Sequence, residues 1–178
     1  KSCSSCVKYE KLQHPDLHLS FPIHLSKTEH SEISDDRREL FVSNLEKYKC
    51  FSKKTWYSSM GNENKQGVIG VKESQSIINK MNFKSFVGGD KILVMWLPEL
   101  MNLQASNKLL KLSEEPDENT YFVLVSENKN KILPTIYSRL QNIVVPKMEL
   151  NTISNFMVNN FQIVESEAKT IANLSDGD

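Results

Sequence analysis

Two cysteines near the start of the chain, Cys3 and Cys6, have the spacing of one half of a zinc-binding clip. A closed structural zinc site needs four ligands, and a thiol pair supplies only part of that set. A redox-active pair with this spacing follows a strand and opens a helix, whereas this pair precedes a predicted strand. We therefore favour two ordinary thiols over a metal or redox site, and Cys3 and Cys6 are the residues that would bind zinc if the chain binds it.

The histidines and lysines give weaker chemical signals. His14 and His18 are four residues apart, but Pro15 stands between them and interrupts a helix that would place both on one face. We expect the histidines to be turn and surface residues (His14, His18, His24 and His30). Acidic neighbours offset the lysines that could contact DNA, so we expect a solvated face there (Lys108, Lys111 and Lys131).

The overall composition excludes several kinds of protein. Among 178 residues, 22 basic residues balance 22 acidic ones, so there is no global positive field that would draw the chain to nucleic acid. No apolar run approaches the roughly 18 residues of a membrane span, and the first residues lack the architecture of a signal peptide. The odd count of three cysteines fits a reducing compartment. We expect a cytoplasmic chain with no membrane contact.

Helical and apolar segments alternate through most of the chain. The patterns predict strands at residues 17–21, 91–96, 121–125 and 143–145, and helices at residues 35–49, 71–82, 103–113 and 134–139. Continuous apolar strands separated by helices, without hairpin signals, are typical of a parallel sheet covered on both faces. The fold class is therefore α/β.

The pattern changes after Lys147, where only helical periodicity remains. Apolar residues at helical spacing mark two further helices (Leu150, Ile153, Met157 and Phe161, then Ala168, Ile171 and Ala172). We therefore expect a sheet-containing domain over residues 1–147 and the start of a small helical domain over residues 148–178.

Four blocks, in order along the chain, resemble the clamp-loader branch of the AAA+ ATPases. Cys3-Ser-Ser-Cys6 followed by His14-Pro15-Asp16 is similar to the family's zinc module, and Ile69-Gly70-Val71 through Gly88-Gly89-Asp90 to the helix and turn before its acidic strand. Residues 91–116 match part of the Asn-Ala-Leu-Leu-Lys-x-Leu-Glu-Glu-Pro signature (Asn107, Leu109, Leu110, Lys111, Glu114, Glu115 and Pro116). Residues 122–141 are similar to the sensor-1 strand and the Ser-Arg-Cys region, with Ser138 and Arg139 at the Ser-Arg positions.

This resemblance implies a RecA-like parallel sheet with flanking helices, followed by a helical lid domain. Lys1 follows no initiator Met, so we expect an excerpt of a longer protein that lacks the N-terminal P-loop part. At the position of a further zinc-module cysteine the chain has Tyr9, which makes a complete zinc site unexpected.

The departures from the family pattern concern the catalytic carboxylates. ATP-hydrolysing relatives end the central strand with Asp-Glu, where one carboxylate holds magnesium through water and the other polarises the attacking water. Trp96 and Leu97 replace this pair and can neither bind a hard cation nor accept a proton, while Glu99 lies beyond the strand end. Ser126 stands where the terminal phosphate would be sensed, but Glu127 adds unfavourable negative charge beside it.

The chain lacks the catalytic carboxylates but keeps the Ser-Arg motif. In this combination it resembles the delta-prime subunits of bacterial DNA polymerase III. In that family, the arginine matching Arg139 reaches into the ATP site of a neighbouring subunit, where its planar charged fork stabilises the transferred phosphoryl group. From composition alone, Arg139 would be an ordinary surface charge. The residue matching Ser138 positions this arginine rather than reacting.

The resemblance therefore implies a non-catalytic clamp-loader subunit of the DNA polymerase III holoenzyme, with no ATPase or polymerase activity of its own and no productively bound nucleotide. Its partners would be the gamma/tau and delta subunits and, through the complex, the sliding clamp and primer-template DNA. Two alternatives remain open. An active gamma/tau-type ATPase needs the carboxylates that Trp96 and Leu97 replace, and an unrelated α/β domain that binds a small ligand or protein would not co-purify with a polymerase assembly.

Overall fold

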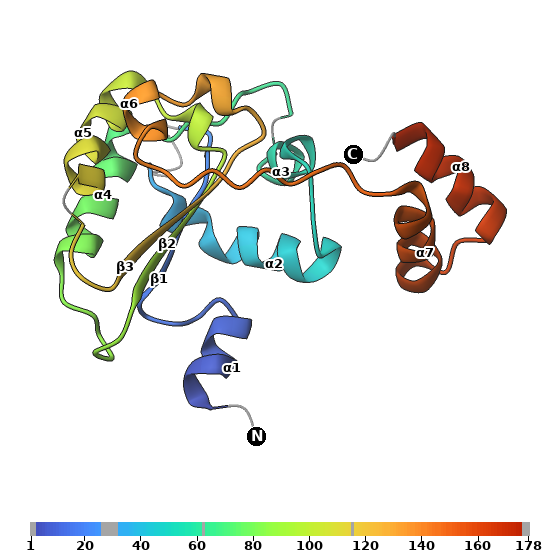
Figure 1. Cartoon of the computed structure of the whole chain (residues 1–178), viewed down its shortest axis with the longest axis horizontal. Coiled ribbons are helices and arrows are strands. Elements are labelled where there is room, and N and C mark those ends of the chain that lie inside the picture. Colours follow the sequence, from blue (N-terminus) through green and yellow to red (C-terminus); the bar gives the residue numbers. More distant parts are fainter. Residues whose placement is uncertain (1–2, 26–31, 62, 115, 176–178) are drawn as a thin grey trace. The chain divides into compact units, whose positions relative to one another are not determined.

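The computed structural model describes residues 3–25, 32–61, 63–114 and 116–175 (Figure 1). Glu115 of the signature and His30 lie outside these ranges. The chain forms two compact units, Lys1–Leu140 and Gln141–Asp178, and each is described by itself. No helix in the described ranges is both long enough and apolar enough to cross a bilayer.

A parallel sheet organises the first unit. Its described strands are β1 (Leu17–Ser20), β2 (Lys91–Trp96) and β3 (Thr120–Val125), in the spatial order β1-β2-β3. Leu17 lies opposite Ile92 and Lys91 opposite Thr120, so Trp96 and Val125 end their strands side by side. The predicted α/β class and the parallel pairing are confirmed.

Helices and short 3-10 turns connect the strands of the first unit. The α-helices are α1 (Ser4–Glu10), α2 (Arg38–Tyr48), α3 (Lys53–Ser59), α4 (Val71–Asn82), α5 (Leu103–Glu114) and α6 (Pro134–Tyr137). The 3-10 turns are η1 (Ser34–Arg37), η2 (Pro98–Leu100) and η3 (Lys129–Lys131). The second unit contains α7 (Leu150–Phe161) and α8 (Glu165–Ser175), which pack on each other. These are the two helices that the sequence predicts after Lys147.

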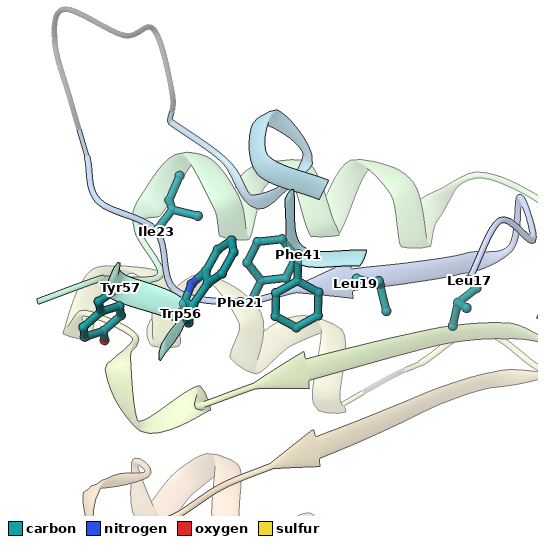
Figure 2. Close-up of a cluster of buried hydrophobic side chains, with 7 residues drawn as sticks. All are labelled: Leu17, Leu19, Phe21, Ile23, Phe41, Trp56 and Tyr57. Carbon is teal, nitrogen blue, oxygen red and sulfur yellow. The ribbon is translucent and has the colours of Figure 1, made fainter. Parts of the chain in front are cut away.

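The two faces of the sheet bury different sets of apolar side chains, because successive residues of a strand point to opposite faces. Helices α2 and α3 cover one face, where β1 and the chain after it contribute most of the core (Leu17, Leu19, Phe21, Ile23, Phe41, Trp56 and Tyr57; Figure 2). Helices α4 and α5 cover the other face (Ile69, Ile77, Met81, Leu93, Met95 and Leu109). Leu93 and Met95 of β2 belong to the second set, while Ile92, Val94 and Trp96 pack against the first.

Helix α3 was not predicted from the sequence. Ser52 caps its start by accepting a hydrogen bond from the Thr55 N–H, and Trp56 is completely buried. The indole N–H of Trp56 donates to the Pro22 carbonyl oxygen over 2.7 Å. The segment between β1 and α4 therefore contributes a large part of the core that packs against β1.

The strand predicted at residues 143–145 is wrong. The described residues 141–149 form neither helix nor strand, and the side chains of Ile143, Val144 and Val145 are 79%, 73% and 86% exposed. An apolar, β-branched run has strand propensity, but it becomes a strand only where another strand accepts its backbone hydrogen bonds.

Two further expectations need correction. The face of β3 that carries Tyr121, Val123 and Val125 is about half exposed, so the sheet is not fully covered on both faces. His14 and His24 are buried rather than exposed, and the ring of His14 stacks on the ring of Tyr9.

Candidate functional site

The carboxyl end of β2 is the position at which the family pattern places catalytic carboxylates. The indole ring of Trp96 packs against Phe41 and Phe51, with ring centroids 5.7 and 5.4 Å away. The Leu97 side chain is fully buried, and its N–H donates to the Val125 carbonyl oxygen over 2.8 Å. Both side chains pack in the core, and neither has an oxygen atom that could bind a cation or a water molecule.

The strand ends in a tight turn at Leu97. This residue has a left-handed backbone with φ of 56°, which is costly for a side chain with a Cβ. Pro98 then opens η2, where its fixed φ suits the first position of a helical turn. The turn carries Glu99 from the end of β2 toward the end of β3.

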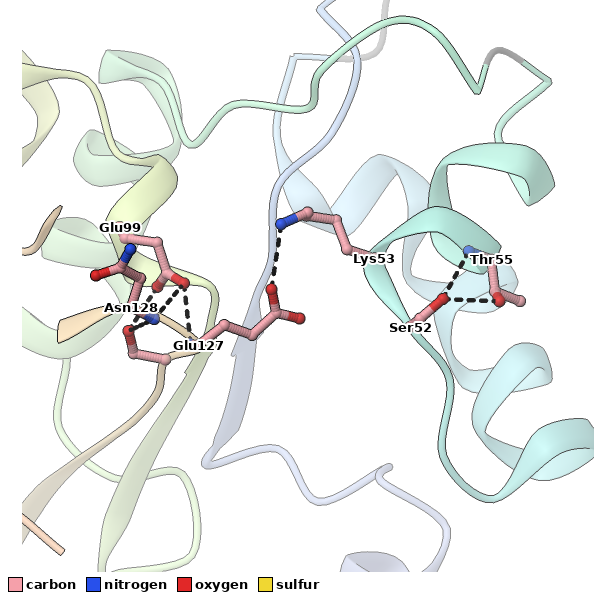
Figure 3. Close-up of polar contacts among 7 residues, drawn as sticks. Ser52, Lys53, Thr55, Glu99, Glu127 and Asn128 are labelled. Carbon is pink, nitrogen blue, oxygen red and sulfur yellow. Dashed lines mark hydrogen bonds and ion pairs between the residues drawn. The ribbon is translucent and has the colours of Figure 1, made fainter. Parts of the chain in front are cut away.

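Glu99 is the centre of a hydrogen-bond network at the ends of β2 and β3 (Figure 3). Its Oε2 atom accepts from the Ser126 hydroxyl over 2.8 Å, and its Oε1 atom accepts from the N–H groups of Glu127 and Asn128 over 3.0 and 3.2 Å. Ser126 is thus occupied by a carboxylate of the same chain. The sequence alone places Glu99 only beyond the end of the strand, although Pro98 directly before it indicates that the chain turns there.

Glu127 directs its carboxylate away from Ser126. It forms an ion pair of 3.1 Å with Lys53 of α3, and both side chains are about half exposed (Figure 3). The negative charge expected beside Ser126 therefore comes from Glu99, not from the Glu127 side chain.

A hollow of about 380 Å³ lies beside Glu99 and is lined by residues 66–68 and 99–102. None of these lining residues is a lysine or an arginine. Asn102 uses its side-chain oxygen to accept from the Ala105 N–H at the start of α5, over 2.8 Å. The hollow thus lacks the cationic side chains that usually hold phosphate groups in phosphoryl-transfer sites.

Arg139 follows α6 and lies against the end of α5. Its Nη2 atom is 2.7 Å from Glu114 Oε1, and its Nη1 atom donates to the Thr135 carbonyl oxygen over 2.5 Å. The Arg139 side chain is 37% exposed and that of Glu114 is 48% exposed. Ser138 donates from its hydroxyl to the Thr135 carbonyl oxygen over 3.2 Å, which secures the end of the helix. The structure thus brings together two residues from separate blocks of the family pattern, Glu114 and Arg139.

The Cys3 and Cys6 thiols are exposed, with their sulfur atoms 3.2 Å apart. Cys3 caps α1, and the Cys6 N–H donates to its sulfur over 3.4 Å. That N–H, together with the Cys6 thiol, lowers the pKa of Cys3, while the hydrogen bond and charge of Cys3 raise the pKa of Cys6. The pair is chemically asymmetric.

In the described ranges, no group of three or more His, Cys, Asp or Glu side chains is placed to hold a metal ion. Tyr9 stacks on His14 with ring centroids 4.1 Å apart, and His14 Nδ1 accepts from the Asp16 N–H over 3.2 Å. His14 thus already has structural partners.

The chain is similar to replication proteins of several bacteria. A family model described as "DNA polymerase III, delta subunit" matches residues 1–149. The chain is 30% identical over 153 residues to the DNA polymerase III subunit delta' of Buchnera aphidicola subsp. Baizongia pistaciae, which covers 84% of this chain and 34% of that protein. It is 24% identical over 176 residues to the subunit delta' of Bacillus subtilis, covering 99% of this chain and 40% of that protein.

The chain is also similar, over a shorter part of its length, to a second DNA polymerase III subunit. The chain is 29% identical over 113 residues to the DNA polymerase III subunit tau of Bacillus subtilis, which covers 61% of this chain and 20% of that protein. A solved structure of a DNA polymerase III gamma subunit-related protein from Thermotoga maritima matches with a TM-score of 0.44 and 27% identity, covering 58% of this chain and 39% of that one. The chain spans well under half the length of the curated relatives named here.

Proposed function

Because the chain belongs to the DNA polymerase III delta-subunit family, we propose that it is part of a delta-prime clamp-loader subunit that hydrolyses no ATP itself and assists hydrolysis in a neighbouring subunit. In this role it acts in the cytoplasm within the replicative polymerase holoenzyme. Its direct partners are the gamma/tau and delta subunits, and it acts on the sliding clamp and primer-template DNA through the complex. The family match argues against an unrelated α/β domain.

The carboxyl end of β2 supports the non-catalytic part of this proposal. Magnesium requires hard oxygen ligands, and activation of the attacking water requires a group that can orient or deprotonate it. Trp96 is packed in an aromatic cluster and Leu97 is fully buried, and neither side chain has an oxygen atom that could bind magnesium. This observation favours delta-prime over an active gamma/tau-type motor, the remaining alternative.

The surroundings of Arg139 support its assignment as an arginine that acts on a neighbouring subunit. The guanidinium is more than a third exposed and is bound to an exposed carboxylate rather than to a buried one. Ion pairs of this kind contribute about 0.2–1 kcal/mol, so a phosphate group in a neighbouring ATP site can compete with Glu114 for the arginine. Ser138 contributes by holding the end of α6, from which Arg139 projects.

Reconstitution of the clamp loader tests the proposal. A loader assembled with the full-length Arg139→Ala protein should keep its composition but lose part of its clamp- and DNA-stimulated ATPase. Wild-type ATPase from an intact variant assembly would remove the role assigned to Arg139. Magnesium-dependent ATPase of the isolated full-length subunit, clearly above background, would favour the gamma/tau-type alternative.

A further inference from the structure

Arg139 is held at the ends of two neighbouring helices, α5 and α6, which contact each other in the first unit (Figure 1). Glu114 is the last residue of α5, and its Oε1 atom lies 2.7 Å from Arg139 Nη2. The Thr135 carbonyl oxygen of α6 accepts a hydrogen bond from Arg139 Nη1 over 2.5 Å. Both terminal nitrogen atoms of the guanidinium are therefore bound within the chain, each by a different helix.

The position of Glu114 strengthens its attraction for a cation. The last carbonyl oxygens of a helix have no intrahelical donors, and they give this end of the helix a partial negative charge. A carboxylate on the last residue of α5 adds to that charge, so a cation beside it is stabilising. Among the described contacts of Glu114, this cation is Arg139, not Lys111 of the same helical turn.

The second contact of Arg139 uses a carbonyl oxygen that the backbone of α6 leaves to side chains. The N–H of Ser138 donates to the Pro134 carbonyl oxygen over 2.9 Å, and that of Arg139 donates to the Ile136 carbonyl oxygen over 3.1 Å. The Thr135 carbonyl oxygen between them accepts from the Ser138 hydroxyl and the Arg139 guanidinium. The Arg139 side chain thus folds back along its own helix, and it must give up this contact to point outward.

We propose that Glu114 is a positioning residue that keeps Arg139 folded back until a neighbouring ATP site presents its phosphate groups. This inference rests on the proposed function of Arg139 and adds its regulation. A terminal phosphate offers more negative charge than one carboxylate and can bind the guanidinium bidentately, so it takes the arginine from Glu114 once the two subunits are close. Before that, the folded-back state lowers the fraction of Arg139 that is competent to act, and with it the ATPase of a loader without clamp and DNA.

Reconstituted loaders measure the effect of this restraint on ATP hydrolysis. With the full-length Glu114→Gln protein, the ATPase without clamp and DNA should rise by roughly 1.5- to 5-fold, the factor by which a solvent-screened ion pair shifts an equilibrium. The stimulated ATPase should stay no lower than in the wild type, so the ratio of the two rates should fall. The matched control is Glu118→Gln, which removes an exposed carboxylate from the loop after α5 but leaves the Glu114–Arg139 pair in place. It should leave both rates unchanged.

Chemical modification follows the arginine directly. Phenylglyoxal reacts with accessible guanidinium groups, and peptide mass spectrometry separates Arg139 from Arg38. In the full-length protein, Glu114→Gln should raise the modification rate of Arg139 by a similar factor to that of the ATPase. Arg38, which donates to the Leu12 carbonyl oxygen over 2.6 Å, should keep its rate. A purely structural role of Glu114 would not raise the rate of Arg139 alone.

The inference and the proposed function can fail separately. If Arg139→Ala lowers the stimulated ATPase but Glu114→Gln changes neither the unstimulated ATPase nor the modification rate, Arg139 acts on the neighbouring subunit without restraint, and only the inference is overturned. An equal rise in Glu118→Gln would also overturn it, because any loss of negative charge near α5 would then suffice. If Arg139→Ala keeps the wild-type stimulated ATPase, the proposed function of Arg139 fails, and its regulation by Glu114 fails with it.

Discussion

The guanidinium of Arg139 lies 2.7 Å from the carboxylate of Glu114, at the end of α5. The residue proposed to act on a neighbouring subunit is thus bound within its own chain. Since both side chains are more than a third exposed, solvent screens the pair and limits what it contributes to stability. Loss of the pair and loss of an interaction with a neighbouring subunit can therefore be separated by experiment.

Arg139→Ala should lower the clamp- and DNA-stimulated ATPase of the reconstituted loader without preventing assembly. Arginine fingers in other phosphoryl-transfer enzymes are worth about 10³–10⁵ in rate, but an assembly with several motor sites would lose only one, so a partial loss is expected. Arg139→Lys should lower the stimulated ATPase nearly as much, because an ammonium group cannot reproduce the bidentate hydrogen bonding of a guanidinium group. Size-exclusion chromatography checks the composition, and ATPase and clamp loading are measured on the same sample.

Glu114→Gln is the matched control for this series. It removes the ion pair of Arg139 but keeps the arginine, so it should leave the stimulated ATPase no lower than in the wild type. If Glu114→Gln and Arg139→Ala lowered the ATPase equally, the effect would come from the pair within this chain and not from contact with a neighbouring subunit.

The full-length protein should show no magnesium-dependent ATPase in isolation. The reason lies at the end of β2, where Trp96 and Leu97 occupy the positions of the two carboxylates. Trp96→Asp with Leu97→Glu should not restore turnover, because the change places two carboxylates in a packed core and leaves Glu99 hydrogen-bonded to Ser126. Steady-state phosphate release is measured with and without magnesium, and turnover by the wild type would contradict the prediction.

Much of the sheet could be predicted because its signals are local. The run from Lys91 to Trp96 is continuously apolar after its first residue, and the helix at residues 71–82 has one clear apolar face, so both appear where the pattern places them. The same reasoning failed at residues 143–145, because a strand also depends on a neighbour that sequence periodicity does not reveal.

The contacts of the candidate site could not be predicted for the same reason. Glu99 and Ser126 are 27 residues apart in the sequence, and Arg139 and Glu114 are 25 residues apart. Local sequence patterns do not reveal contacts between residues so far apart. Ser126 and Arg139 were identified from the resemblance, but their carboxylate partners appear only once the strands are paired. Helix α3 was missed because the burial of Trp56 depends on the Pro22 carbonyl oxygen, 34 residues away.

The chain should contain less than stoichiometric zinc when it is purified without chelators. The Cys3 and Cys6 thiols supply part of a tetrahedral set, and incomplete sites hold the ion weakly. Elemental analysis of the purified protein measures the content, with Cys3→Ser and Cys6→Ser together as the control for adventitious metal. Stoichiometric zinc in the wild type that is lost in the double variant would contradict the prediction and imply further ligands.

Cys3 should react faster than Cys6 with iodoacetamide near neutral pH. The reactive species is the thiolate, and the Cys6 N–H lowers the pKa of Cys3 while Cys3 raises the pKa of Cys6. Peptide mass spectrometry after brief alkylation gives both rates in one sample. In Cys6→Ala the backbone donor remains but the thiol is lost, so Cys3 should keep most of its advantage over an unstructured cysteine peptide. Equal rates for the two wild-type thiols would count against the asymmetry.

Asp16→Asn should destabilise the chain at neutral pH and flatten its acid denaturation. Burial alone would raise the pKa of Asp16, but hydrogen bonds from the Phe86 N–H, the Ser85 hydroxyl and the Val87 N–H outweigh it and hold the pKa below the ordinary 3.8. A carboxyl group with a lowered folded-state pKa stabilises the fold above its unfolded pKa, and this contribution is lost as the pH falls through the folded pKa. We therefore expect Asp16→Asn to cost about 1–3 kcal/mol at pH 7 and progressively less below about pH 4. Urea denaturation at several pH values measures this, and the exposed Asp90→Asn is the control. An equal loss of unfolding free energy at pH 7 and pH 2.5 would show that the Asp16 charge has no part in stability.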